Sequence, residues 1–118
     1  MKLADAKDSR RIYNIRRTIE PPDFNGDWSG GVWADVQPLE ISHFHAAGSE
    51  HRPVTQAKLL FDNEHLYIFF RVQDRYVRAV ADGFQGRVWE DSCAETFLQP
   101  RQDRGYFNFE MNLSLIHI

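Results

Sequence analysis

The spacing of hydrophobic and polar positions predicts a chain built from β-strands. Apolar-rich runs at 55–61 and 66–73 are separated by the turn-forming residues 62–65, and this arrangement predicts a β-hairpin. In the second run aromatic side chains fall on both faces, which is typical of a strand inside a sandwich. No apolar pattern of helical period extends over ten or more residues, so we expect no long helix.

Two further strands with alternating side chains are predicted near the C-terminus, at 92–98 and 106–112. In the second of these, the alternation predicts that Phe107, Phe109 and Met111 lie in a core while the opposite face is polar. Weaker patterns predict strands at 33–44, with an interruption at Pro38, and at 77–81.

Strand runs separated by turn signals at this spacing predict an all-β fold. We expect an antiparallel β-sandwich of the immunoglobulin-like or jelly-roll type.

The pattern divides the chain into a polar segment at 1–20, a main domain at 21–112 and a tail at 113–118. The polar segment is expected to be a solvated arm or a strand edge, with an anion site as the alternative. It lacks the apolar core of a secretory signal peptide. The compartment therefore stays open: extracellular or periplasmic if the true start lies upstream, and otherwise cytoplasmic. The basic cluster in this segment consists of Arg10, Arg11, Arg16 and Arg17.

The tail Leu113–Ile118 reads LSLIHI. The DNA sequence CTG TCT CTT ATA CAC ATC, the mosaic end used in transposon library preparation, encodes these six residues in order. We therefore expect the tail to be a sequencing-adapter artefact and the natural domain to be cut off near Asn112. A natural apolar strand is the alternative.

Composition narrows the class of protein. The chain has 118 residues, a size that suits one small domain. Its 14 Lys and Arg residues are outnumbered by 17 Asp and Glu residues, a balance that argues against nucleic-acid binding. The longest apolar run, 66–70, is too short to span a bilayer. The single cysteine, Cys93, excludes a disulfide framework.

Trp89 is the first candidate binding residue, because it lies in a polar loop just before a predicted strand. An exposed indole can stack on the apolar face of a sugar ring, and a nearby carboxylate such as Glu95 can accept hydrogen bonds from sugar hydroxyls. Core packing of Trp89 is the alternative, and the local pattern leaves both interpretations open.

Other candidates are weaker. Three histidines can form a zinc site, but we expect ordinary surface histidines here because no supporting pattern surrounds them. Glu95 and Glu110 could be imagined as a glycosidase pair, although a ligand-binding or structural pair is favoured. Cys93 is expected to be a small core residue rather than a nucleophile. The three histidines are His43, His45 and His51.

Several stretches in this order resemble carbohydrate-binding module family 9 and its bacterial, xylanase-associated relatives. The resemblance covers roughly residues 20–112, and its order and spacing are more specific than any single motif. The stretches are HRPVTQAKLLFD at 51–62, LYIFFRVQD at 66–74, VWEDSCAETFL at 88–98 and YFNFEMN at 106–112.

The resemblance implies a β-sandwich about twice as long as the native part seen here. It implies non-catalytic binding of glucose- or xylose-type sugars, often at chain ends, beside or within enzymes that degrade xylan and cellulose. In such modules the sugar lies between two Trp rings. Trp89 matches the first ring and Glu95 a sugar-binding carboxylate, and the second Trp is expected in the missing C-terminal half. Asn108 and Asn112 could extend the site.

The resemblance also bears on cofactors, partners and alternatives. Some members hold structural calcium, but no ligand set for it is identifiable in this chain and no other cofactor is expected. The expected partners are sugars or polysaccharide and a covalently linked catalytic domain, with no nucleic acid and no membrane. Two alternatives stay open: part of a glycoside hydrolase, or a structural sandwich without a working sugar site.

Overall fold

The computed structural model describes residues 11–113. Arg10 and the tail residues 114–118 lie outside the described residues, so the expectation of an adapter tail stays a prediction. The described residues form six β-strands in two sheets and two single-turn 3-10 helices, with no α-helix among them. The predicted all-β class is therefore confirmed. The described residues divide into two compact units: 11–50 with 54–72, and 51–53 with 73–113.

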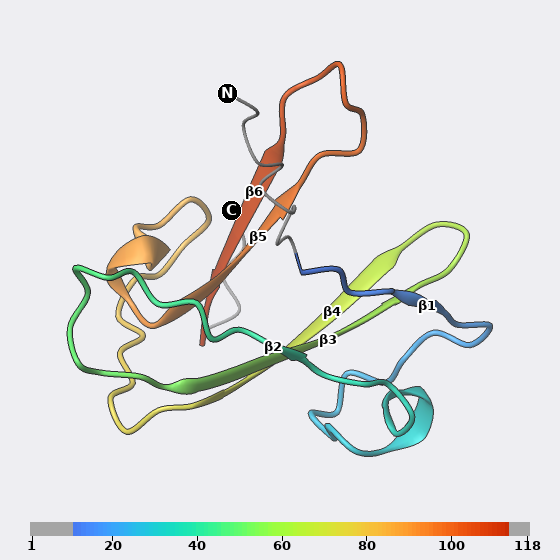
Figure 1. The fold of residues 1–118 in the computed structure, drawn as a ribbon, viewed down its shortest axis with the longest axis horizontal. Coiled ribbons are helices and arrows are strands. Elements are labelled where there is room, and N and C mark those ends of the chain that lie inside the picture. Colours follow the sequence, from blue (N-terminus) through green and yellow to red (C-terminus); the bar gives the residue numbers. More distant parts are fainter. Residues whose placement is uncertain (1–10, 114–118) are drawn as a thin grey trace, which may run out of the picture. The chain divides into compact units, whose positions relative to one another are not determined.

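The first unit is organised around the predicted hairpin. Its strands are β3 (Val54–Phe61) and β4 (Leu66–Gln73), which pair side by side (Figure 1). The short strand β2 (Leu39–Glu40) pairs antiparallel with the middle of β3, and β1 (Arg16–Arg17) pairs in parallel with its end. The polar segment thus contributes a strand edge, as predicted, although in an unexpected parallel pairing.

Asp62 closes the hairpin turn. Its Oδ1 accepts hydrogen bonds from the backbone N–H groups of Glu64 and His65, at 2.8 and 2.7 Å. The Tyr67 hydroxyl donates to Oδ2 at 2.6 Å. The Tyr67 hydrogen bond, more than the backbone ones, lowers the pKa of Asp62 to about 2. These hydrogen bonds therefore favour the ionised form of the Asp62 carboxylate in the turn.

The core of the first unit lies under β3. Trp33, Val36 and Leu60 are buried together. The buried Lys58 donates from Nζ to the carbonyl oxygens of Trp28 and Trp33, both at 2.8 Å, so its charge is compensated by directed hydrogen bonds. Burial is the main cause that lowers the pKa of Lys58, with a contribution from Arg71.

The strand predicted at 33–44 is wrong over most of its length. Trp33 ends the 3-10 helix η1 (Gly31–Trp33), and only Leu39–Glu40 pair as a strand. The core draws the Trp33 indole inward, and the hydrogen bonds from Lys58 hold the backbone there. Pro38, which has no N–H to donate to a sheet, separates this turn from β2.

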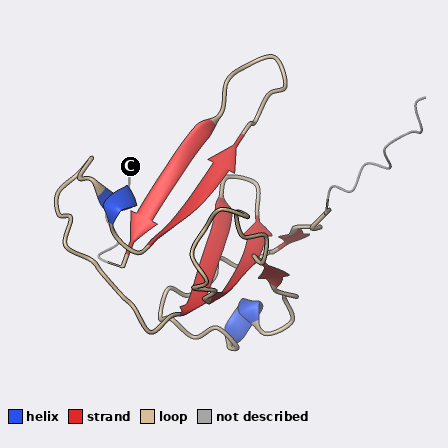
Figure 2. Cartoon of the chain, turned by 60° about the vertical axis from the view of Figure 1, so that its left-hand side comes forward, coloured by secondary structure: helices blue, strands red, loops and turns tan. Residues whose placement is uncertain are grey.

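The second unit contains the other two predicted strands as a long antiparallel hairpin, β5 (Cys93–Leu98) and β6 (Phe107–Asn112) (Figure 2). The 3-10 helix η2 (Val88–Glu90) lies against both strands. The strand predicted at 77–81 is wrong, because the backbone N–H groups of Val80 and Ala81 donate to the Asp91 carboxylate instead of to a sheet.

The prediction of which face of β6 is buried is also wrong. Phe107 is 60% exposed and Phe109 is 41% exposed, whereas Asn112 on the opposite face is 3% exposed. The Asn112 amide donates to the Ala81 carbonyl oxygen and to Asp91 Oδ2, at 3.2 and 3.0 Å. These hydrogen bonds compensate for the burial of the polar Asn112 side chain. They cannot be predicted from the alternation of side chains along the strand.

Candidate functional site

Trp89 stands on the single turn η2, next to a fully buried anchor. Val88 is 0% exposed and Trp89 is 53% exposed. A 3-10 helix has about three residues per turn, so successive side chains point roughly 120° apart. Burial of Val88 therefore turns the Trp89 indole outward. The exposure of Trp89 favours the interpretation of a surface residue over that of core packing.

The loop before η2 is tightly folded. A Cβ on Gly86 would lie 2.6 Å from the carbonyl oxygen of Asp82, closer than side-chain carbons approach a backbone oxygen. Gly83 has a φ of +78°, a conformation that glycine adopts without strain. The sequence of this loop thus fixes where the turn carrying Trp89 begins.

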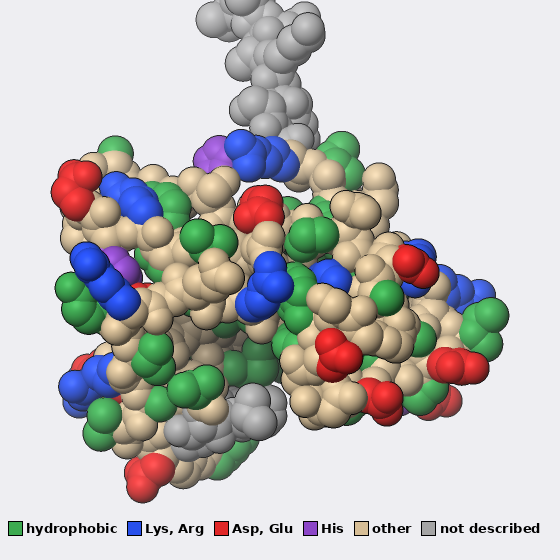
Figure 3. Space-filling model, turned by 90° about the horizontal axis from the view of Figure 1, so that it is seen from below, with side chains coloured by type: hydrophobic (Ala, Val, Ile, Leu, Met, Phe, Trp, Pro, Cys, Tyr) green, Lys and Arg blue, Asp and Glu red, His purple; other side chains and the backbone are tan. Residues whose placement is uncertain are grey.

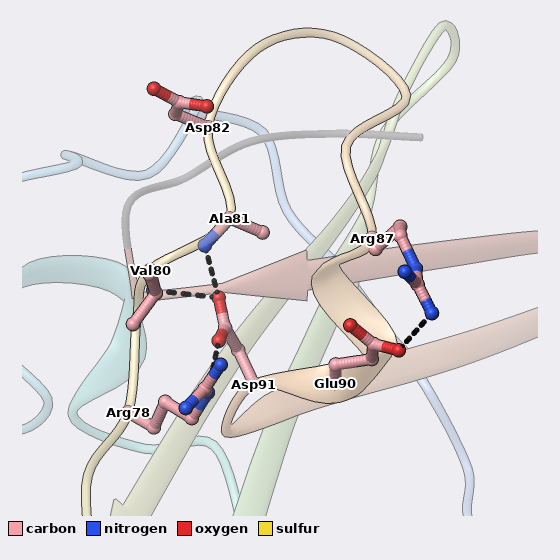
Figure 4. A pocket seen from close by; sticks show the side chains of 7 residues that line it. All are labelled: Arg78, Val80, Ala81, Asp82, Arg87, Glu90 and Asp91. Atoms are coloured by element: carbon pink, nitrogen blue, oxygen red, sulfur yellow. Dashed lines mark hydrogen bonds and ion pairs between the residues drawn. The ribbon is translucent and has the colours of Figure 1, made fainter.

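Asp91 fixes the other end of η2. Its side chain is 1% exposed, and its Oδ2 accepts the N–H groups of Val80 and Ala81, both at 2.8 Å (Figure 4). Oδ1 accepts Arg78 Nε at 3.1 Å, and Oδ2 also accepts the Asn112 amide. Burial alone would raise the pKa of Asp91, but these hydrogen bonds outweigh it and lower the pKa.

A cleft opens beside η2, with a volume of about 270 Å³. This lies just below the range of roughly 300–1,000 Å³ that is usual for drug-sized ligands, so the cleft suits a smaller molecule. Arg87 and Glu90 form an ion pair at its edge, and Asp91 lies at its centre (Figure 4). The lining residues are Arg78, Val80, Ala81, Asp82, Arg87, Glu90 and Asp91.

The cleft offers hydrogen-bond donors and acceptors side by side. The guanidinium groups of Arg78 and Arg87 donate, and the carboxylates of Asp82 and Glu90 accept. A sugar hydroxyl both donates and accepts, so such a mixed lining matches a polyol better than it matches a purely anionic or cationic group. Figure 3 shows both basic and acidic side chains at the surface of the described residues.

The remaining predicted ligands share one face of the β5–β6 hairpin. The register pairs Glu95 with Glu110 and Cys93 with Asn112, and directly paired residues lie on the same face of a sheet. Glu95 is exposed, whereas Asn112 is buried with its amide engaged by Asp91. Asn108 lies on the same face, and its amide donates to Glu110 Oε1 at 2.8 Å. The structure thus places Glu95, Asn108 and Asn112 on one face of the hairpin, with Trp89 on the turn that contacts this hairpin.

Sequence reasoning missed Asp91 and its partners. The only signal was an acidic residue between the Trp and the strand. Its partners Arg78, Val80 and Ala81 lie 10 to 13 residues earlier, in a segment predicted as a strand.

The surroundings of Cys93 disfavour a role for its thiol as a nucleophile. Burial, followed by the neighbouring Glu95, Glu110 and Asp91, raises the pKa of the Cys93 thiol. The thiol is therefore protonated at neutral pH and a poor nucleophile.

The histidines show no metal site. His51 Nε2 lies 2.9 Å from Asp74 Oδ1, and His45 Nδ1 accepts the N–H of Ala47 at 3.1 Å. Within residues 11–113, no group of three His, Cys, Asp or Glu side chains is placed to hold a metal ion. Over the same residues, no helix has the length and apolarity needed to cross a membrane.

Comparison with known proteins assigns the family. The model of carbohydrate-binding family 9 matches residues 33–116, which is well over half of the chain and includes η2, the cleft and the β5–β6 hairpin. Neither a curated protein nor a solved structure matches the chain at a significant level. Carbohydrate-binding domains of this kind act by binding and not by catalysis. On the strength of the family match, the chain belongs to carbohydrate-binding family 9.

Proposed function

We propose that this chain binds glucose- or xylose-type sugars, without chemical turnover, at Trp89 and the adjoining cleft. One observation carries the proposal: an indole that is 53% exposed stands on a turn fixed at both ends, by buried Val88 and by buried Asp91. Exposing a large aromatic side chain costs hydrophobic stabilisation, and holding it rigidly outward is how a protein prepares a stacking surface.

The binding mode follows from the two exposed sides of η2. Trp89 offers a flat apolar surface to the C–H face of a pyranose ring. Glu90, one residue further, lines the cleft and accepts hydroxyl protons. Glu95 is the carboxylate that the sequence predicts as a sugar ligand, and Glu90 is an addition to it. In this proposal Asn112 does not contact the ligand, because its amide already donates to Asp91. It supports the site by holding Asp91 in place.

The biological role we propose is attachment of a polysaccharide-degrading enzyme to xylan or cellulose. A small open cleft and one stacking surface suit weak, reversible binding of a sugar chain. The catalytic domain would lie elsewhere in the same protein.

Titration calorimetry of the full chain with xylose, glucose and their oligomers tests the proposal, with reducing-sugar release from xylan measured in parallel. Saturable heat with no released sugar supports the proposal. Released sugar would instead favour the glycosidase alternative, in which Glu95 and Glu110 act as the pair. If a protein that unfolds cooperatively gives neither heat nor released sugar, the remaining alternative, a structural sandwich without a working sugar site, is favoured.

A further inference from the structure

The loop that joins β1 to η1 (Figure 1) contains an asparagine followed by a glycine, Asn25 and Gly26. Asn25 is exposed, and it is the only asparagine in the chain with a glycine after it. Gly26 has a φ of +81°, and apart from its chain neighbours no described atom lies within 4 Å of the position that a Cβ would take. No side chain therefore hinders the approach of the Asn25 amide to the Gly26 nitrogen.

A hydrogen bond folds the Asn25 side chain back over the backbone that follows it. Asn25 Oδ1 accepts the backbone N–H of Asp27 at 2.9 Å. The side-chain amide carbon Cγ is thereby held on the side of the Gly26 nitrogen, and a bond between these two atoms would close a five-membered ring. The Asp27 N–H also points at the oxygen on which negative charge develops during such a ring closure, and a donor in that position stabilises the charge.

We propose that Asn25 is a site of spontaneous deamidation in the folded protein. The Gly26 nitrogen gives up its proton to a base in solution and bonds to Asn25 Cγ. The bond from Cγ to the side-chain nitrogen then breaks, and this nitrogen takes up a proton from solution and leaves as ammonia. Water opens the resulting succinimide at one of its two carbonyl carbons, which leaves aspartate or isoaspartate at position 25. The amide and one water thus become a carboxylic acid and ammonia, with no change of oxidation state.

The reaction adds a negative charge to a loop that is already acidic. Asp23, Asn25 and Asp27 line the same small hollow, so deamidation gathers three carboxylates around it. Like charges at short distance repel one another. The isoaspartate product also lengthens the main chain by one carbon, which changes the path of the loop.

The same loop holds an acceptor for the buried charge of the first unit. The carbonyl oxygen of Trp28 accepts Lys58 Nζ at 2.8 Å, and the Trp28 indole packs edge-on against Phe69 with ring centroids 5.1 Å apart. A buried ammonium group depends on such acceptors, so displacing the loop destabilises the first unit. Neither Trp89 nor the cleft takes part, and the proposal is therefore independent of the proposed function.

Asn63 offers a matched control in the same unit. It is also exposed and lies in a turn, and its Oδ1 also accepts a hydrogen bond, from the Arg17 guanidinium. The residue after it is Glu64, which has a side chain and whose backbone N–H already donates to Asp62 Oδ1 at 2.8 Å. The two asparagines thus share exposure and a hydrogen-bonded amide oxygen, and they differ in the residue whose nitrogen must attack.

The experiment incubates the full chain at pH 8 and 37 °C and follows each asparagine by peptide mass spectrometry, with enzymatic detection of isoaspartate. Asn25 should convert about ten-fold faster than Asn63 or more, because only its neighbour lacks a side chain. Conversion should slow at pH 5, where the hydroxide that removes the Gly26 proton is scarcer. Asn25→Gln should not convert, because its ring closure would need six members. After incubation, the midpoint of urea unfolding should fall in the wild type and stay constant in Asn25→Gln.

A sample unfolded in urea and incubated in parallel shows how fast Asn25 reacts without the fold. Conversion in the unfolded sample alone would mean that the folded loop protects Asn25, and this result would overturn the proposal. Equal rates at Asn25 and Asn63 in the folded chain would also overturn it, because Gly26 would then have no influence. Conversion of Asn25 with an unchanged urea midpoint would refute the expected coupling of the loop to Lys58.

Discussion

Replacing Trp89 with alanine separates a binding role from a structural one, because the structure fixes how much of the indole each role uses. The side chain is 53% exposed, so somewhat less than half of its surface contributes to packing. A fully buried Trp→Ala change costs about 3–5 kcal/mol. We therefore expect Trp89→Ala to lower the free energy of unfolding by about 2 kcal/mol or less.

The expected loss of affinity for sugar follows from the exposed part of the Trp89 indole. Stacking on a sugar contributes about 1 kcal/mol beyond area burial. Covering about 40 Å² of the indole adds about 1 kcal/mol at 25 cal/mol per Å². Together these predict an affinity for xylose or glucose about thirty-fold weaker in Trp89→Ala.

Calorimetric titration and urea unfolding of the same preparations measure the two quantities. Phe84→Ala is the control: Phe84 is 80% exposed in the loop before η2 and belongs neither to η2 nor to the β5–β6 hairpin, so its removal should leave the affinity unchanged. An unaltered affinity in Trp89→Ala, combined with a loss of stability near the value for a buried ring, would refute the reasoning and leave the proposed site without its stacking surface.

The strands were predictable where the side chains that pattern them also pack against one another. The β3–β4 hairpin follows from two apolar runs and a polar turn, and β4 spans the residues expected for it. The turn at Trp33 was not predictable in the same way. The apolar residue next to Trp33 continues a strand pattern, whereas the buried Lys58 donates to the Trp33 carbonyl oxygen and holds the backbone in a turn. A hydrogen bond between residues 25 positions apart leaves no trace in local alternation.

The residues of the candidate site likewise divide into those that the sequence predicts and those that only the folded structure reveals. The polar neighbours of Trp89 made it a candidate but left its exposure open, which the structure gives as 53%. The register of the hairpin brings Glu95 and Asn108 to one face. Asp91 could not be predicted, because its importance comes from four donors on other segments. The exposure of Phe107 and the burial of Asn112 reversed the expected faces of β6, since burial depends on what packs against a strand as well as on its own pattern.

Three further predictions test the groups that form and support the site. Glu95→Gln should weaken sugar binding several-fold in the same titrations, because a charge-assisted hydrogen bond becomes a neutral one; unchanged affinity would remove Glu95 from the site. Asp91→Asn should speed hydrogen exchange at the Val80 and Ala81 amides, which lose their carboxylate acceptor, and should also weaken sugar binding; unchanged exchange would show that Asp91 does not hold the loop. The last prediction concerns Asp62, whose pKa is lowered from 3.8 to about 2, chiefly by the Tyr67 hydroxyl. Because the folded-state pKa lies below the unfolded one, Asp62 stabilises the fold fully above the unfolded pKa, and this contribution is lost as the pH falls toward 2. Urea unfolding from pH 6 to pH 2 should therefore show a smaller acid-induced loss of stability in Asp62→Asn than in the wild type, with the variant less stable at pH 6. Parallel curves for the two proteins would mean that the turn does not depend on the charge of Asp62.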